Sequence, residues 1–216
     1  MFLAAAIAAC WAAMPMRVEA QDVLDAGGLT LRDFSVADNG ASFYRGNSIV
    51  GTSADEVASR VVAIDAAAGL ARIRFDSIKV EVALPLGWQA TEDWERGVGY
   101  SSDRRYRLIV WRVDFAFEGV ADAEHYVATK SGAIRARRPT IQAQARKLKD
   151  GTFLVAYENV PPGQGDHGTR AVFDVVMAKP GNPKEGVLMT LGVPAQDADR
   201  GLKLIALLKI NMRIDW

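Results

Sequence analysis

The chain has 216 residues, 50% of them hydrophobic, and its 26 basic residues balance its 26 acidic ones. That length suits one medium domain whose core is large enough to need neither disulfides nor a structural metal. Because the formal net charge is zero, no global field attracts nucleic acid or an anionic membrane, and any electrostatic role must be local.

Residues 1–16 form an uncharged, mostly apolar run that is typical of a secretory signal peptide. Small residues at Val18 and Ala20 predict cleavage before Gln21, so that residues 1–20 are removed. The run is shorter than the roughly 20 residues of a membrane-spanning helix, so we expect no transmembrane segment in the mature chain. Arg17 follows the apolar run instead of preceding it, which suggests a start codon further upstream. The alternative is a buried N-terminal helix.

Cys10, the only cysteine, lies inside this run. Its context, Ile7-Ala8-Ala9-Cys10, is similar to a lipobox, but too few residues precede it, so we expect no lipid anchor at Cys10. After cleavage the mature chain has no cysteine, which excludes thiol catalysis, disulfides and cysteine metal sites. We therefore predict a periplasmic or secreted bacterial protein.

Residues 21–74 are predicted to form a partly ordered N-terminal extension, because they are rich in Gly, Ser, Asp and Asn. Within it, Ser53 and Glu56 match a capping box. Val57, Val61 and Ile64 then recur at helical spacing, which predicts a helix. The β-branched residues of the same stretch leave a strand as the alternative.

Beyond residue 70 the pattern becomes that of strands, first over 70–75 and 78–84. The strongest strand prediction covers 106–117, and its expected buried face consists of Ile109, Trp111, Val113, Phe115 and Phe117. A helix is expected over 121–135. Its inward stripe would be Ala123, Tyr126, Val127 and Ile134.

Four strands are expected next, over 140–148, 152–159, 170–178 and 186–193, followed by a helix over 196–210. Lys149-Asp150-Gly151 is typical of a tight hairpin turn between the first two of these strands. Leu204, Leu207 and Leu208 would pack the last helix inward. The order predicts an α+β fold, an antiparallel β-sheet packed by helices, over residues 75–216.

Several landmarks accompany this succession. Leu84-Pro85-Leu86-Gly87-Trp88 follows a strand, and a Gly-Val-Gly-Tyr-Ser-Ser segment at 97–102 precedes the long apolar strand. The Asp150-Gly151 hairpin and the helix after Pro194 come later. Over residues 75–214 the chain thereby resembles the PsbP-like superfamily of small α/β sandwich domains. The resemblance implies an exported domain that acts through contacts with other molecules, and it brings no catalytic residues.

No motif predicts a catalytic, metal or cofactor site. Gly163 to Gly168 match G-x-G-x-x-G, but a strand follows where a dinucleotide site needs a helix, so a hairpin loop is expected. The only histidines, His125 and His167, lack the spacing of metal ligands. A hydrolase using Asp166 and His167 remains a distant alternative.

Two features predict a contact surface. Between residues 135 and 149 every charged side chain is basic, which predicts a patch for an anionic or acidic partner, with a solvated face as the alternative. Two tryptophans flank Glu92-Asp93 in an expected loop and would add aromatic contacts, with core packing as the alternative. The predicted contact residues are Arg135, Arg137, Arg138, Arg146, Lys147, Trp88 and Trp94.

The sequence therefore favours a non-enzymatic binding or assembly module of the cell envelope. Its expected partner is an envelope protein or an anionic envelope component, and not nucleic acid. The alternative is a carrier that holds a small apolar ligand between sheet and helix.

Overall fold

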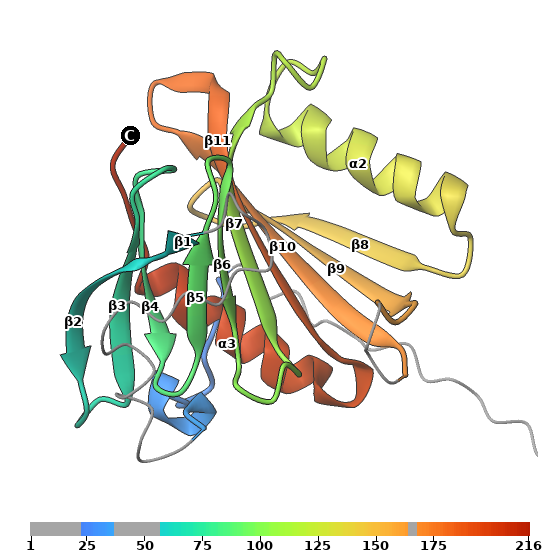
Figure 1. Cartoon of the computed structure of the whole chain (residues 1–216). Coiled ribbons are helices and arrows are strands. Elements are labelled where there is room, and N and C mark those ends of the chain that lie inside the picture. Colours follow the sequence, from blue (N-terminus) through green and yellow to red (C-terminus); the bar gives the residue numbers. More distant parts are fainter. Residues whose placement is uncertain (1–22, 37–56, 164–167) are drawn as a thin grey trace, which may run out of the picture.

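The computed structural model describes residues 23–36, 57–163 and 168–216 (Figure 1). Three predicted features lie outside these residues: the signal peptide with Cys10, the capping box at 53–56, and the pair Asp166 and His167. Within the described part, an eight-stranded and a four-stranded antiparallel sheet are packed by two α-helices, which confirms the predicted α+β class.

The strands of the larger sheet are, in spatial order, β1 (Val57–Ala58), β5 (Gln89–Glu92), β6 (Arg96–Tyr100), β7 (Arg107–Asp114), β11 (Asn182–Pro194), β10 (Arg170–Lys179), β9 (Phe153–Val160) and β8 (Gln142–Lys147). Those of the smaller sheet are β12 (Arg213–Ile214), β4 (Val80–Pro85), β3 (Leu70–Phe75) and β2 (Arg60–Asp65). The helices are α2 (Ala123–Arg137) and α3 (Ala198–Ile210), with short 3-10 turns η1 (Leu31–Phe34) and η2 (Ala195–Asp197). Strands β8 to β11 form the predicted meander, because each pairs with its neighbour in the chain.

One face of the larger sheet packs against α3 and the four-stranded sheet, and the other face packs against α2 (Figure 1). The α3 side holds the main core, to which Leu24, Leu31 and Phe34 from the N-terminal segment also contribute. The two sheets approach each other closely at β6. A Cβ atom at Gly97 would overlap the Phe75 ring, so only glycine fits there.

Helix α2 begins after Asp122, whose side chain caps its N-terminus. Asp122 accepts a hydrogen bond of 2.9 Å from the backbone N–H of His125, which satisfies one of the free donors of the first turn. The predicted inward residues Ala123 and Val127 are buried, and Tyr126 and Ile134 pack against the same cluster. The predicted terminal helix is likewise confirmed as α3, with Leu204, Leu207 and Leu208 buried.

Three expectations were wrong. The helix expected from Val57 is two strands, β1 and β2, so the β-branched alternative holds. The loop expected between Trp88 and Trp94 is shorter than predicted, because Gln89–Glu92 form β5 and only residues 93–95 form the turn of the β5–β6 hairpin. The expected buried face of residues 106–117 is incomplete, because Leu108 and Val110 on the opposite face are fully buried under the second layer.

Candidate functional site

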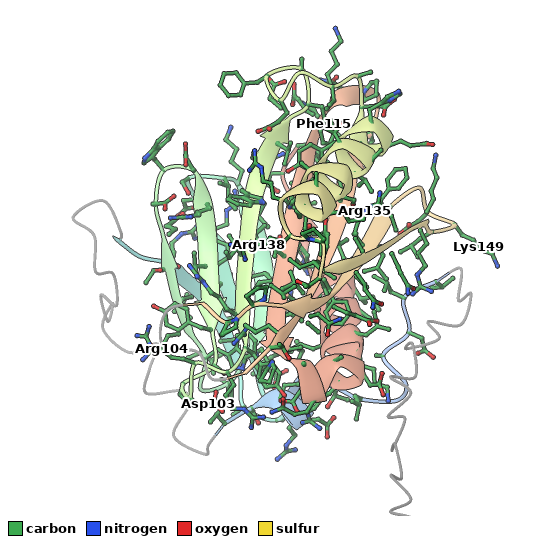
Figure 2. The ribbon with its side chains drawn as sticks, turned by 90° about the vertical axis from the view of Figure 1, so that its right-hand side faces the viewer. Asp103, Arg104, Phe115, Arg135, Arg138 and Lys149 are labelled. Atoms are coloured by element: carbon green, nitrogen blue, oxygen red, sulfur yellow. The ribbon has the colours of Figure 1, made fainter. Side chains whose placement is uncertain are left out.

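The basic residues of 135–149 form two separate groups. Strand β8 runs back along α2, so that the Lys147 Nζ lies 3.4 Å from the Glu124 Oε2 in the first turn of the helix. A rise of 1.5 Å per residue places Arg137 about 20 Å from Glu124 along the helix axis. Figure 2 likewise shows Arg135 and Arg138 well apart from Lys149. The structure therefore brings Arg135, Arg137 and Arg138 together at one end of β8, and Arg146 and Lys147 at the other.

The first group has a local role that needs no partner. Arg135 and Arg137 lie in the last turn of α2, where cations interact favourably with the free carbonyl groups of the helix. Within the described part of the chain, neither they nor Arg138 form an ion pair. In the second group, Lys147 forms the ion pair with Glu124, and its Nζ also lies 5.2 Å from the centre of the Phe153 ring.

The two tryptophans lie in different environments. Trp88 is fully buried, stacks on Tyr106 with ring centres 6.2 Å apart, and donates from Nε1 to the Phe34 carbonyl at 3.2 Å. Trp88 therefore belongs to the core and offers no ring surface to a partner. Trp94, in contrast, is 74% exposed in the β5–β6 turn.

The turn that carries Trp94 is firmly built. The Asp93 carboxylate accepts hydrogen bonds from the backbone N–H groups of Glu95 and Arg96, both at 2.9 Å. It also forms an ion pair of 2.9 Å with the Arg96 side chain. These hydrogen bonds and this ion pair lower the pKa of Asp93 against the raising effect of burial, so the carboxylate stays charged and the turn stays fixed near neutral pH.

Two more exposed aromatic residues lie at the same end of the molecule. Phe117, in the connection from β7 to α2, is 89% exposed, and the C-terminal Trp216 is 42% exposed. Arg96 pairs with Trp111, so the β5–β6 turn lies beside the end of β7 that leads to Phe117. The Trp216 ring lies 5.2 Å from the Arg112 guanidinium of β7. We call Trp94, Phe117 and Trp216 the aromatic end; in Figure 1 the β5–β6 turn, the β7–α2 connection and the C-terminus all lie in the upper part of the molecule.

The sequence reasoning missed two of these three residues. Phe117 was assigned to a buried strand face, but β7 ends at Asp114, whose carboxylate accepts from the N–H groups of Ala116 and Phe117. An Asp that turns the chain in this way is a recognisable strand stop, so Asp114 was the available signal. No comparable signal marks Trp216.

A buried polar cluster lies beneath α2. Asp174 on β10 is 1% exposed, lies 2.9 Å from the Lys130 Nζ of α2 and accepts a hydrogen bond from the Thr190 hydroxyl. Burial raises the pKa of the neighbouring Tyr126 to about 12, and it also raises the pKa of Tyr157. Both hydroxyls therefore stay protonated near neutral pH.

His125 is exposed, and its Nδ1 lies 2.8 Å from the Asp122 carboxylate. That hydrogen bond raises the pKa of His125. Within the ranges that the structure describes, no three His, Cys, Asp or Glu side chains come close enough to hold a metal ion. No helix in those ranges has the length and apolar character needed to cross a membrane.

No protein-family model and no curated protein matches the chain. Two solved structures are similar to it in fold. A cyanobacterial PsbP (CyanoP) from Synechocystis is 17% identical, with a TM-score of 0.47, over 77% of this chain and 99% of that one. A mutant of the protein Mog1 is 12% identical, also with a TM-score of 0.47, over 67% of this chain and 95% of that one. The PsbP structure comes from the superfamily that the sequence resembles, and at these identities the likeness concerns the fold alone.

Proposed function

We propose that the protein is a non-enzymatic binding or assembly module that acts in the cell envelope after export. The observation that carries this proposal is the aromatic end. Exposed Trp and Phe rings are costly to hydrate, and such residues dominate the energetics of protein interfaces. Three of them at one end of the sandwich are the best contact surface in the described part of the chain.

The proposed contact surface is held in place before any partner arrives. Asp93 fixes the turn around Trp94, and Asp114 fixes the chain at Phe117. Arg112 donates to the Ile78 carbonyl at 2.8 Å and to the Asp215 carbonyl, next to Trp216. A backbone held in this way loses little conformational freedom on binding, which favours affinity. We expect the partner to be an envelope protein.

Export is supported by the apolar residues 1–16 and by the cleavage pattern at Val18 and Ala20. The mature protein should therefore begin at Gln21 and reside in the periplasm or outside the cell. Intact-mass measurement of protein from an envelope fraction checks this start. A mass that includes residues 1–20 would contradict it.

The binding role is tested by native mass spectrometry on complexes purified from that fraction. The test variant is Trp94→Ser with Phe117→Ser. The control is Ile210→Ser, which removes another exposed apolar side chain, 66% exposed, from α3. We expect the wild type and the control to carry the same partner, and the test variant to lose it.

Retention of the partner by the test variant would overturn the role of the aromatic end. A chain that carries no macromolecule in any of the three samples would contradict the binding role. A bound small-molecule mass in its place would favour a ligand carrier.

A further inference from the structure

Among the described residues, four strands lie at sheet edges, and three of them are short or irregular. Strands β1 and β12 have two residues each, too few to guide another strand. Strand β2 carries an irregularity in its register between Val61 and Ala63. Short strands and bulges are ordinary protections against pairing with another chain.

Strand β8 lacks these protections. Its pairing with β9 runs in unbroken register from Gln142 opposite Glu158 to Lys147 opposite Phe153. Its centre, Ala143 to Ala145, has small or neutral side chains and contains no proline. Within the described ranges no strand pairs with its outer side, so this edge presents backbone donors and acceptors along about 20 Å.

The charges around β8 specify which kind of strand fits there. Arg137 and Arg138 come just before the strand, and Lys147 ends it. Two acids lie beside the strand: Glu124 pairs with Lys147, and Glu158 on β9 lies opposite Gln142. A second copy of this chain would bring β8 against β8 and place basic groups opposite basic groups, which disfavours self-pairing.

From this geometry we propose that the outer edge of β8 binds an extended, acidic segment of a partner protein by adding it to the sheet as a further strand. The backbone of the segment pairs with β8, and its acidic side chains meet the basic groups at the two ends. The inference rests on the proposed binding role and names a second contact, separate from the aromatic end. The two basic groups lie at opposite ends of β8, and in this proposal each contacts one end of the same bound segment.

The test uses the full mature chain and a synthetic ten-residue peptide of alternating Thr and Val with Asp and Glu at both ends. A second peptide carries N-methyl groups on alternate residues along one edge, which removes its donors but keeps its charge. A third carries Lys in place of the acids. Binding is measured by fluorescence anisotropy, and hydrogen exchange of residues 142–147 reports where binding occurs.

We expect the acidic peptide to bind and to slow hydrogen exchange in β8, and the other two peptides to bind at least about tenfold more weakly. Arg137→Glu with Arg138→Glu should weaken the acidic peptide about tenfold. The matched control, Lys79→Glu with Lys184→Glu, makes the same charge change at two exposed residues, one in the β3–β4 turn and one at the start of β11, and should leave binding unchanged.

Equal binding of the acidic and N-methylated peptides would overturn the proposal, because it would show charge attraction without strand addition. Absence of binding, or protection outside residues 142–147, would also overturn it. Since the peptides contain no aromatic residue, these results are independent of the Trp94 experiment.

Discussion

The two faces of the eight-stranded sheet are built differently. On the α3 face the core is apolar, and Leu204, Ile205 and Leu208 of the helix are completely buried. On the α2 face the helix buries only Ala123, Val127 and Ser131. The cluster there includes buried polar atoms, at Trp111 Nε1, Ser131 Oγ and Tyr157 Oη.

Because of this difference, we expect the α3 face to determine the global stability and the α2 face to change conformation more easily. Hydrophobic burial is non-directional and large, so the α3 face should set the free energy of unfolding. Helix α2 buries fewer side chains, and polar contacts add to its packing: the Lys130–Asp174 and Lys147–Glu124 ion pairs and the Asp122 cap. Such contacts respond to pH and salt, so α2 and the adjoining β8 form the half that is easier to shift.

The largest effect is expected on the α3 face. Leu204→Ala should lower the free energy of unfolding by about 3 kcal/mol, because it removes a fully buried side chain and leaves a cavity. Denaturant unfolding measures this. Ile210→Ala on the same helix removes an exposed side chain and should change stability by less than about 0.5 kcal/mol. Similar losses for both variants would contradict the assignment of the core.

A smaller loss is expected on the α2 face. Lys130→Met removes the cation that pairs with the buried Asp174 carboxylate, which keeps the hydrogen bond from the Thr190 hydroxyl. Because Lys130 is itself partly exposed, we expect a loss of about 2 kcal/mol in the same unfolding measurement. Adding Asp174→Asn removes the unpaired charge and should restore part of the loss. A double variant that is less stable than Lys130→Met would contradict the idea that the loss comes from the unpaired Asp174 charge.

The comparison also predicts unequal local opening. The amides of α2 should exchange hydrogen at least about tenfold faster than those of α3, because fewer buried apolar contacts resist the opening of α2. Native-state hydrogen exchange followed by NMR measures both helices in one sample. Equal protection would show that the two faces open as one unit.

The smallest effect concerns the α2 cap. The hydrogen bond to Asp122 raises the pKa of His125, so the stabilisation from the charged imidazole is complete below its ordinary pKa of about 6.5 and is lost as pH rises through the raised value. The same contact lowers the pKa of Asp122, whose stabilising effect is lost only as pH falls through that lowered value. NMR titration should show the His125 pKa falling in Asp122→Asn. An unchanged pKa would contradict the pairing.

Alternation in the sequence was enough to predict strands such as β3 and β4, because each buries at least one regular face. The β5–β6 hairpin was not predicted, because Gly97 and Gly99 weaken the strand pattern in the sequence. These glycines are needed because they make room for Phe75 and Leu84, which lie on other strands. In β7, alternation could not reveal that layers cover both faces.

The candidate surfaces were only partly visible in the sequence. The basic composition of 135–149 is a sequence property, but its division into two groups depends on β8 running back along α2. Trp88 and Trp94 look equivalent in the sequence. Only the contacts of Trp88 with Phe34 and Tyr106 show that one is core and the other is surface.

The close approach at Gly97 has a consequence for the evolution of this fold. Since any side chain there would occupy the space of the Phe75 ring, the two positions can change only together. A homologue with alanine at position 97 should carry a smaller residue at position 75, and one that keeps the aromatic ring should keep the glycine. This pair is therefore a specific mark by which distant relatives can be aligned, even where overall identity is too low to guide the alignment.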